Sequence, residues 1–423
     1  LDPARLVAWL LTLFAVSVLG SFWAAAELVI AGGRDPFAVA AWGSLQSSSW
    51  LELYRELSYT PVLVGLPALL AGAIFPAACS LHGEGATDAG RQVGAVLAAN
   101  GVGAALGALL GAFGLVPLVG IQGAFVLVAL GAVLAASLAL LASAASPKER
   151  RRALVPPLGL AAVVVAMPAA LPRSMLLSVV GPRHQILLHY EEARTGTVSV
   201  IESQIHGERQ LLINSVNEVT TRLVHDQSFK LLGHLGPLLH PDPRRALMIC
   251  LGAGISAGAA LRHPLEDLDV VDLSAAVARG ARHFSAENND VLDAPNLHLH
   301  IADGRHFLLD SSGGYDLAII DSTHPKAVDS WLLYTEEFYR LVHARLAPDG
   351  IAVQWLPLHG LSEREFKIVV RTFLAAFEHT TLWATAGIET YGLVAYAKLV
   401  GHKGGAARID LAELERRLST PAL

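Results

Sequence analysis

The stretch ALMICLGAGISAG, residues 246–258, decides the fold of the C-terminal half of the chain. An apolar run leads directly into a glycine-rich turn that contains Gly252, Gly254 and Gly258, and the next apolar run ends in Asp272, twenty positions after Gly252. Glycines let a backbone turn tightly beneath a ligand, and a carboxylate after the second strand can accept hydrogen bonds from both ribose hydroxyls. The pattern predicts a nucleoside-binding site, although the same glycines could form a plain strand-to-helix connection.

Strand-like and helix-like segments alternate on both sides of this motif. The predicted strands are residues 246–252, 268–274, 297–303, 316–321 and 351–357, with helices at residues 257–262, 275–288 and 335–346. Residues 380–385 and 391–398 are expected to close the sheet as an antiparallel hairpin. This repetition predicts a doubly wound, mostly parallel α/β sheet with helices on both faces. Before it, residues 185–193, 196–203 and 209–215 predict a small antiparallel sheet.

The N-terminal part of the chain has a different character. Residues 1–175 hold nearly all of the long apolar runs, and a helix that crosses a bilayer needs about 20 such residues. Five spans are predicted, at residues 6–30, 59–81, 93–118, 124–144 and 154–171. Asn100 lies among the small residues of the third span, where it could form a helix-to-helix hydrogen bond or belong to a transport site. The last segment contains three prolines and could be re-entrant.

The composition agrees with two parts of unlike character. The chain has 423 residues, of which 53% are hydrophobic and only 16% charged, too apolar for a wholly soluble protein. A formal net charge of -6 offers no basic surface for a nucleic-acid backbone. With two cysteines, neither a disulfide framework nor a thiolate metal cluster is expected. The first residue is Leu rather than Met, so we expect that a start or a longer N-terminal portion is missing.

Two further turns follow predicted strands of the parallel sheet. Asp303 and Gly304 come after the third strand, where a carboxylate can bind the amine of an adenine ring or simply begin an Asp-Gly turn. Asp321 and His324 lie in the sequence DSTHP after the fourth strand. Ligands of open parallel sheets bind outside the carboxyl ends of the strands, so these two are the candidate catalytic residues. Either could act as general base, because a carboxylate accepts protons and a histidine titrates near neutrality.

Two aromatic residues complete the candidate pocket. Trp331 and Tyr334 flank it and could form its wall or pack beside the start of a helix. The 17 histidines show no metal-ligand spacing such as HExxH, so no metal site is predicted.

Taken together, these motifs resemble the spermidine synthase family. The resemblance rests on ALMICLGAGISAG, the acid in VVDLS, IADGR, DSTHP and LLYTEEFYRLVHARLAPDGIAVQW, and it covers residues 185–398. The apolar half is similar to bacterial membrane proteins in which a spermidine synthase-like domain is fused to a transporter-like membrane region. The resemblance implies a Rossmann-like fold of the S-adenosylmethionine methyltransferase type. It also implies that S-adenosylmethionine or decarboxylated S-adenosylmethionine serves as co-substrate.

The resemblance implies roles for individual residues. Gly252, Gly254 and Asp272 would hold the methionine-adenosyl group and its ribose. Asp303 would contact adenine, and Asp321 would match the catalytic aspartate of the family.

The chain departs from the family pattern at three places. His324 stands where the family carries a second acid, and residues 194–197 stand where it carries a Tyr-Gln pair. Val224 and His225 replace a further acidic pair, although Asp226 is adjacent. A cationic diamine needs carboxylates to offset its desolvation, so these departures argue against ordinary polyamine synthesis.

The sequence supports two functions from different classes. The first is a membrane-anchored transferase that moves an aminopropyl, related alkyl or methyl group to an unknown acceptor, which could itself be membrane-borne. The second is a non-catalytic nucleoside-binding or structural subunit of a membrane complex. A transporter ranks last because the spans carry almost no charge. The expected partners are the lipid bilayer, a small-molecule nucleoside donor and other membrane proteins, without nucleic acid.

The expected organisation combines an α-helical transmembrane region with a Rossmann-like α/β domain and a small antiparallel β-subdomain. Its parts are residues 1–175 (membrane helices), 183–218 (small sheet), 219–400 (Rossmann-like domain) and 401–423 (tail). The expected location is the inner membrane. The basic cluster at residues 148–152 favours the cytoplasm for the adjoining loop. A cytoplasmic C-terminal domain is therefore favoured, and a complete last span would place that domain on the opposite side.

Overall fold

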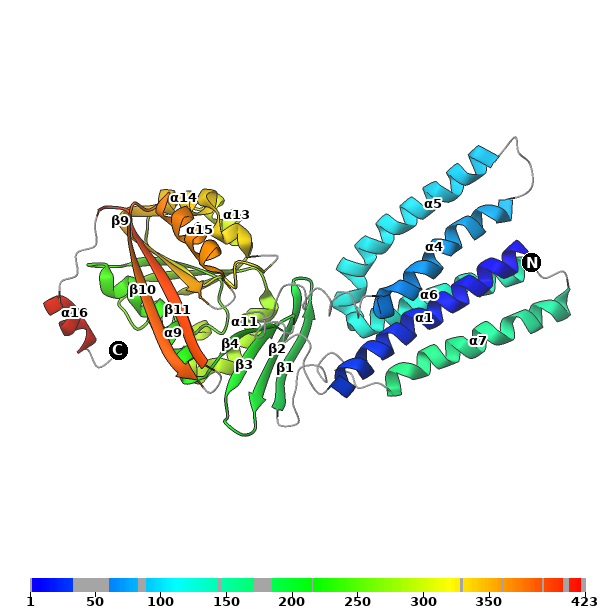
Figure 1. Ribbon diagram of the computed structural model, residues 1–423, viewed down its shortest axis with the longest axis horizontal. Coiled ribbons are helices and arrows are strands. Elements are labelled where there is room, and N and C mark those ends of the chain that lie inside the picture. Colours follow the sequence, from blue (N-terminus) through cyan, green and yellow to red (C-terminus); the bar gives the residue numbers. More distant parts are fainter. Residues whose placement is uncertain are drawn as a thin grey trace. The chain divides into compact units, whose positions relative to one another are not determined.

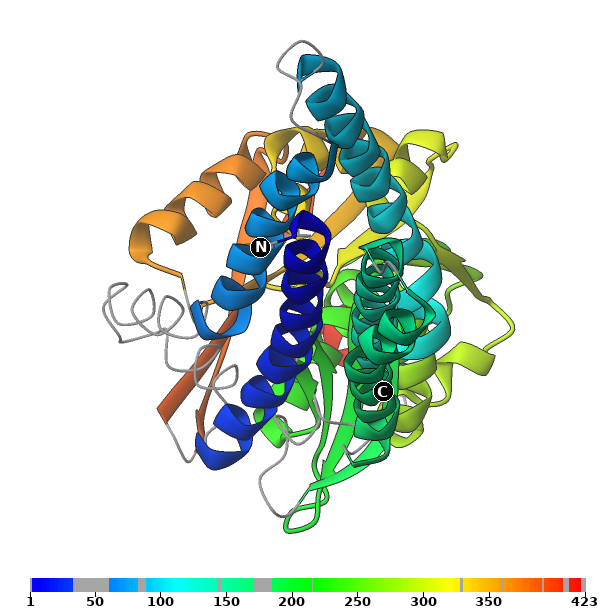
Figure 2. The ribbon, with the colours of Figure 1, turned by 90° about the vertical axis from the view of Figure 1, so that its right-hand side faces the viewer.

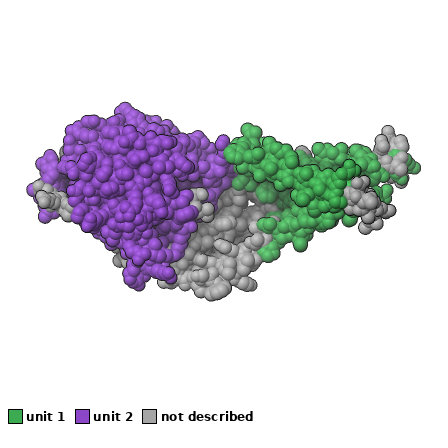
Figure 3. Space-filling view, turned by 90° about the horizontal axis from the view of Figure 1, so that it is seen from above, with its two compact units in different colours: residues 1–183 green, residues 184–423 purple. Residues whose placement is uncertain are grey.

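The chain divides into two compact units, which Figure 3 colours separately. The structure is a computed structural model that describes residues 2–32, 61–82, 89–143, 146–170, 185–214, 216–327, 330–358, 361–389, 392–405 and 411–419. The first unit ends at Arg183 and the second begins at His184. Each unit has a hydrophobic core of its own.

The first unit is helical. Its described helices are α1 (Pro3–Gly32), α4 (Leu66–Cys79), α5 (Ala89–Leu110), α6 (Val116–Ser143) and α7 (Pro147–Ala170). Short helical turns adjoin them at η1 (Pro61–Gly65), η2 (Ser80–His82) and η3 (Gly111–Leu115). Helix α1 packs against α4 and α6, and α6 packs against α7 (Figures 1 and 2). The helices coincide with the five predicted apolar segments, of which residues 59–60, 144 and 171 lie outside the described residues.

These helices meet through small side chains and expose large ones. Ala15, Ala129 and Ala132 belong to the buried cluster, as expected where helix backbones approach closely. Leu69 and Leu118 are 74% and 83% exposed. By length and composition, two described helical stretches could cross a membrane, Pro3–Ser21 and Gly90–Ser143. The apolar segments Leu66–Cys79 and Leu154–Val164 are shorter, so these helices support fewer spans than the five that were predicted.

The second unit contains two sheets. The antiparallel sheet has the strand order β1 (Gln185–Ala193), β2 (Gly196–Ser203), β3 (Arg209–Ile213) and β4 (Val216–Thr220). The larger sheet has the order β10 (His379–Glu389), β11 (Gly392–His402), β9 (Leu346–Pro357), β8 (Tyr315–Ile320), β5 (Arg245–Ile249), β6 (Asp267–Asp272) and β7 (Leu297–Ile301). Strands β5 to β9 run parallel, while β10 and β11 form an antiparallel hairpin against β9. The predicted sheets are confirmed, and β4 is a strand that the prediction lacked.

Helices cover both faces of the larger sheet (Figure 1). On one face, α9 (Leu223–Leu239) and α10 (Ile255–Ala260) pack on apolar side chains of the strands, such as Met248 and Val353. On the other face, α13 (Gly304–Asp310), α14 (Glu336–Arg345) and α15 (Glu363–Leu374) bury an aromatic cluster around Phe338 and Phe373. The remaining elements are α11 (Ala275–Ala281), η4 (Arg282–Phe284), α12 (Ser285–Asn288), η5 (Val291–Asp293), η6 (Trp331–Tyr334) and α16 (Leu411–Leu418).

The strand order creates a crevice beside β5. From β5 the chain continues to β6 and β7 on one side, and β8 then lies on the other side. Where the winding direction reverses in this way, the helices diverge and leave room outside the carboxyl ends of the strands. Cys250 follows β5 and Asp321 follows β8, so both lie at this crevice.

Candidate active site

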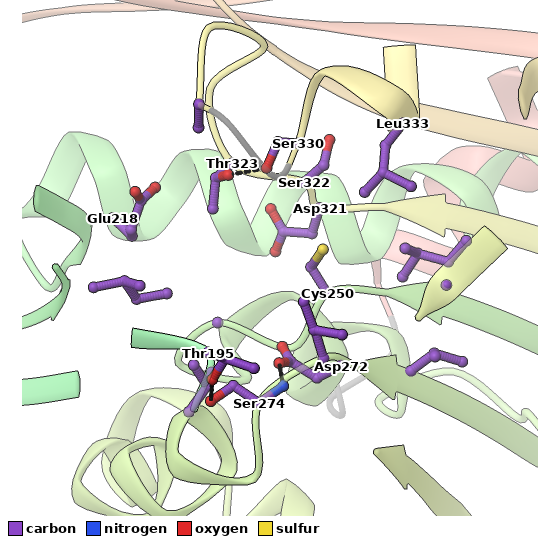
Figure 4. A pocket seen from close by; sticks show the side chains of 18 of the residues that line it. Thr195, Glu218, Cys250, Asp272, Ser274, Asp321, Ser322, Thr323, Ser330 and Leu333 are labelled. Carbon is purple, nitrogen blue, oxygen red and sulfur yellow. Dashed lines mark hydrogen bonds between the residues drawn. The ribbon is translucent and has the colours of Figure 1, made fainter. Parts of the chain in front are cut away.

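A cavity of about 670 Å³ opens at the carboxyl ends of the parallel strands. The small sheet contributes another part of the wall through Val198, Ile213 and Val216. The lining is largely apolar, with carboxylates set into it at Glu218, Asp272, Asp303 and Asp321. Figure 4 shows Asp272 on one side of the cavity, and Asp321 with Thr323 on the other. The volume suits a small-molecule ligand.

The glycine-rich loop forms the floor beside β5. Gly252 lines the cavity and has a φ of 55°, and Gly254, with a φ of 78°, immediately precedes α10. Both conformations are left-handed, which glycine adopts without steric cost. Gly258 has a different role, because a Cβ atom there would lie 2.1 Å from the carbonyl oxygen of Asn288. The loop therefore owes its shape to the first two glycines and its close packing to the third.

Asp272 ends β6 and fixes the loop around it. Its carboxylate accepts hydrogen bonds from the backbone N–H groups of Leu251 (2.9 Å) and Ser274 (2.8 Å). Burial raises the pKa of Asp272, and these hydrogen bonds, with one from Gly252, oppose that rise. The hydroxyl of Thr195, in the β1–β2 turn, donates to the Ser274 hydroxyl at 2.8 Å. The acid thus ties the glycine loop to the end of β6.

Asp303 and Gly304 lie at the start of α13. The Asp303 carboxylate caps the helix by accepting a hydrogen bond from the backbone N–H of His306 at 2.8 Å. A Cβ atom on Gly304 would come within 2.7 Å of the Ile249 side chain, so glycine lets α13 begin close to β5. Both residues line the cavity.

Asp321 is half-buried and lines the cavity. The Ser256 hydroxyl, on α10, donates a hydrogen bond of 2.7 Å to its carboxylate. Burial raises the pKa of Asp321 to about 6, while the Ser256 hydrogen bond and the charge of Lys398 oppose that rise. A carboxyl group with this pKa is ionised at neutral pH and is a stronger base than an exposed aspartate, so it is suited to accept a proton.

Lys398 is a buried cation behind Asp321. It lies on β11, has no solvent exposure, and donates hydrogen bonds to the hydroxyls of Ser228 (2.7 Å) and Thr385 (3.0 Å). Burial lowers the pKa of Lys398 to about 8, and the nearby Asp321 charge opposes this fall. Lys398 pairs with Trp355 of β9, a residue that lines the cavity. The positive charge of Lys398 therefore lies one strand away from the cavity, next to the wall that β9 forms.

The carboxylates of the cavity all act on the thiol of Cys250. Burial raises the pKa of its thiol well above the usual range, and so do the charges of Asp272, Asp321, Glu218 and Asp303. The thiol stays protonated as a result and is a poor nucleophile. The same convergence makes this part of the cavity strongly favourable for a cationic ligand.

Comparisons with known proteins place the chain in a family. The family model described as "Spermine/spermidine synthase domain" matches residues 227–403. The polyamine aminopropyltransferase of Moorella thermoacetica is 30% identical over 217 residues, which are 50% of this chain and 74% of that protein. The chain belongs to the spermine/spermidine synthase family. Another member, the spermidine synthase of Dictyostelium discoideum, is 25% identical over 234 residues, covering 54% of this chain and 79% of that one.

Among solved structures of the family, a spermidine synthase in complex with the transition state analogue AdoDATO is similar to this chain with a TM-score of 0.47. Its sequence identity is 22%, and the similarity covers 54% of this chain and 76% of that chain.

Most of the residues predicted from the sequence to bind the donor or to act as base meet at the cavity. Its lining includes Gly252, Asp272, Asp303, Gly304 and Asp321. Gly254 and Gly258 are not among the lining residues, so they act on the cavity through the shape and packing of the loop.

Three other predicted residues lie outside the lining. The Nδ1 atom of His324 accepts a hydrogen bond from the backbone N–H of Lys326 at 3.1 Å, which makes His324 part of the turn after Asp321. Trp331 is 53% exposed, and Leu332 and Leu333 form the wall in its place. Tyr334 is buried and donates a hydrogen bond of 3.0 Å to the carbonyl of Thr323. Tyr334 therefore stabilises the turn that follows Asp321 without lining the cavity.

Three polar residues in or beside this cavity were not predicted from the sequence. Glu218 lies on the unpredicted strand β4, in the polar sequence VNEVT. Ser256 lies inside the glycine motif and could have been noticed as its hydroxyl-bearing residue. Lys398 offered the clearest signal, because it interrupts the apolar run YGLVAYAKLV, in which a charge has no ordinary place.

Proposed function

We propose that this chain transfers an aminopropyl group from decarboxylated S-adenosylmethionine to an amine acceptor. The observation that carries the proposal is the convergence of Glu218, Asp272, Asp303 and Asp321 on one cavity. The decarboxylated donor is a sulfonium with a terminal ammonium group and no carboxylate. S-adenosylmethionine carries a carboxylate in addition, which the acids of this cavity would repel. Charge therefore favours the decarboxylated donor, and with it aminopropyl rather than methyl transfer.

The donor would lie across the ends of β5, β6 and β7. Gly252 leaves space for its sugar, and Asp272 supplies carboxylate oxygens beside that space. Asp303 would bind the adenine amine, and Leu273 and Leu309 offer apolar surface for the ring. In this pose the sulfonium would lie near Asp321, which follows β8 on the other side of β5.

The proposed reaction is a single displacement. The acceptor nitrogen attacks the methylene carbon bonded to the sulfonium sulfur, and a C–N bond forms as that C–S bond breaks. The electron pair of the C–S bond goes to sulfur, which leaves as the neutral thioether methylthioadenosine. The acceptor nitrogen loses one proton to the Asp321 carboxylate, directly or through water. Because the donor is already activated, the protein supplies orientation, a base and exclusion of water.

Product analysis tests this function. Full-length chain in detergent would be incubated with the decarboxylated donor and a mixture of aliphatic amines, and methylthioadenosine would be quantified by chromatography. We expect release that requires both the amine and the enzyme. Binding of the donor without release would instead support a non-catalytic nucleoside-binding subunit. Methyl transfer from S-adenosylmethionine would overturn the choice of donor.

The charge of Lys398 is expected to set the pH dependence of this reaction. Asp321 must be ionised to accept a proton, so activity rises as the pH passes its pKa of about 6. Lys398, whose pKa is about 8, is charged at that pH and opposes the rise in the pKa of Asp321. Lys398→Met removes this charge, so the pKa of Asp321 rises. The acid limb of kcat/KM should move to higher pH, and activity at pH 6 should fall more than activity at pH 8.

A pH profile of kcat/KM from pH 5 to pH 9 would measure the shift. Lys403→Met is the matched control, since Lys403 donates to the carbonyl of Leu346 away from the cavity and should leave the limb in place. An acid limb that stays at the wild-type pH in Lys398→Met would contradict the coupling.

The helical unit is part of the proposal as a membrane anchor. Its two long apolar helical stretches and its exposed leucines, among them Leu69 and Leu118, support attachment to a bilayer. We expect the full-length chain to sediment with membranes of the expressing bacterium, to stay there through washes with high salt and alkaline carbonate, and to dissolve in mild detergent. Recovery of folded chain in the supernatant after the salt wash would contradict the anchor.

A further inference from the structure

The wall of the cavity beside Asp321 is apolar. The segment between β8 and α14 contributes Ala327, Leu332 and Leu333 to the lining, and Figure 4 shows Leu333 on the same side of the cavity as Asp321. Leu332 is 37% exposed although it is a large hydrophobic residue. An exposed leucine that lines a cavity offers apolar surface to a ligand. These three residues form the acceptor wall, so called because Asp321, the proposed base, lies beside them.

The polar groups of the same segment are already paired within the protein. The hydroxyls of Thr323 and Ser330 share a hydrogen bond, which Figure 4 draws as a dashed line. The buried Ser322 hydroxyl accepts a hydrogen bond of 3.2 Å from the side-chain amide of Gln354. Groups that already have partners gain less from a ligand than free groups do. The acceptor wall therefore presents mainly hydrocarbon to the acceptor.

The carboxylates of the cavity are matched without a second charge on the acceptor. Asp272 accepts backbone N–H groups, Asp303 caps α13, and Asp321 is the proposed base. Glu218 has no hydrogen-bond or ion-pair partner among the described residues, and burial raises its pKa to about 7. The decarboxylated donor brings two positive charges, a sulfonium and an ammonium, which Glu218 is left to compensate. A second ammonium on the acceptor would find no further acid among the described lining residues.

Lys398 adds a positive charge next to the acceptor wall. It is buried on β11, and its charge opposes the rise in the pKa of Asp321. A second ammonium close to Asp321 would be repelled by this charge and would lose its hydration against leucine side chains. An alkyl group in the same place has neither cost and removes apolar surface from water. Charge and lining therefore favour the same kind of acceptor.

We propose that the acceptor is a primary monoamine with an apolar body, whose hydrocarbon part lies against Leu332 and Leu333 while its nitrogen attacks the donor beside Asp321. This inference rests on the proposed aminopropyl transfer and keeps the bond changes of that reaction. The acceptor class is then an alkylamine rather than a diamine. Leu332 determines this specificity, because it is the most exposed leucine of the acceptor wall.

Amines of matched length separate the two acceptor classes. The probes are 1-aminobutane, 1-aminohexane and 1-aminooctane, with 1,6-diaminohexane and 1,8-diaminooctane as the matched diamines, and release of methylthioadenosine gives kcat/KM. For the monoamines, kcat/KM should rise roughly 2- to 4-fold per methylene, since each methylene leaves water for an apolar wall. Each diamine should fall at least about 10-fold below the monoamine of its length, because its second ammonium would lose hydration there.

Leu332→Asn tests the acceptor wall itself. Leu332 is partly exposed, so the fold should tolerate the polar residue. The substitution should lower kcat/KM for 1-aminooctane by roughly 5- to 20-fold through a higher KM, and that for 1-aminobutane by less than about 3-fold. A merely structural role would lower both values equally. Leu382→Asn is the matched control, since Leu382 is 54% exposed on β10 and lies outside the lining.

Lys398→Met tests the charge argument. Without this cation, the ratio of kcat/KM for 1-aminooctane to that for 1,8-diaminooctane should fall at least about 3-fold. The ratio cancels any change in Asp321 as a base, because both amines use the same base. Lys403→Met should keep the wild-type ratio, since Lys403 donates to the carbonyl of Leu346 away from the cavity.

The outcomes distinguish the two proposals. If the matched diamines are used as well as the monoamines, or if kcat/KM does not rise with chain length, the apolar acceptor is overturned and aminopropyl transfer stands. If no amine elicits release of methylthioadenosine, the function fails and the apolar acceptor fails with it. Use of 1-aminooctane in solution or of 1-aminohexadecane in phosphatidylcholine vesicles supports the acceptor class, and the preferred form shows whether the acceptor is dissolved or membrane-borne.

Discussion

Asp321→Asn is expected to lower kcat by at least about 100-fold, because a positioned general base typically contributes 10²- to 10⁴-fold. The amide keeps an oxygen that can accept the Ser256 hydrogen bond, so the loop around α10 should keep its shape. What is lost is the proton acceptor. The dissociation constant of methylthioadenosine should change by less than about 3-fold. Single-turnover release of methylthioadenosine and calorimetry of its binding would measure the two effects separately.

Stability gives an internal control for this variant. Burial raises the pKa of Asp321 to about 6 in the folded chain. Between the ordinary pKa of an aspartate and pH 6, this carboxyl group is ionised in the unfolded chain and protonated in the folded chain. The free energy of unfolding therefore falls as the pH rises through this range. At pH 7 a neutral asparagine removes this loss of stability, and the variant should not melt below the wild type. His324→Ala should keep kcat within about 5-fold, since His324 lies outside the cavity lining. The reverse ranking, with His324→Ala inactive and Asp321→Asn active, would overturn the assignment of the base.

The parallel sheet and two of its terminal acids could be predicted from the sequence for one physical reason. Strands buried on both faces read as unbroken apolar runs, and their carboxyl ends must meet at one edge. An acid that ends such a run therefore has a predictable place. Asp272 and Asp321 lie in that position. Asp303 instead follows β7, an alternating and partly exposed edge strand, and the cavity brings the three acids together.

Glu218 and Lys398 could not be placed in this way. The inward direction of Glu218 depends on a one-residue bulge between β3 and β4, and a shift of one residue exchanges the two faces of a strand. The position of Lys398 depends on β11 pairing with β9 and β9 with β8, contacts between segments far apart in sequence. Its apolar neighbours indicate that Lys398 is buried, but only the strand order shows that it stands behind Asp321.

Gly258→Ala is expected to give one of the largest losses of stability among single-methyl additions to the second unit. A Cβ atom at position 258 would lie 2.1 Å from the carbonyl oxygen of Asn288 and 2.7 Å from its carbon. These are backbone atoms, so no side-chain rotation can relieve the overlap. Asn288 is itself held, because its side-chain amide donates to the carbonyls of Ala253 (2.8 Å) and Ala281 (2.9 Å). The contact can relax only if α10 moves.

Helix α10 has little room to move, because α9 packs against its other side, where a Cβ atom on Gly233 would lie 2.1 Å from the carbonyl of Ser256. We expect Gly258→Ala to lower the free energy of unfolding by about 3 kcal/mol, since overpacking of a close contact costs 1–3 kcal/mol and occasionally more. The melting temperature should fall by roughly 6–12 °C in a unit of this size. Gly107→Ala, at an α5 position with no atom within 4 Å of the new methyl group, should leave the melting temperature nearly unchanged. Because α10 also carries Ser256, any folded Gly258→Ala chain should show a higher pKa for Asp321 in its pH profile. A variant that melts with the wild type and keeps its acid limb would show that α10 can shift away from Asn288 without disturbing the base.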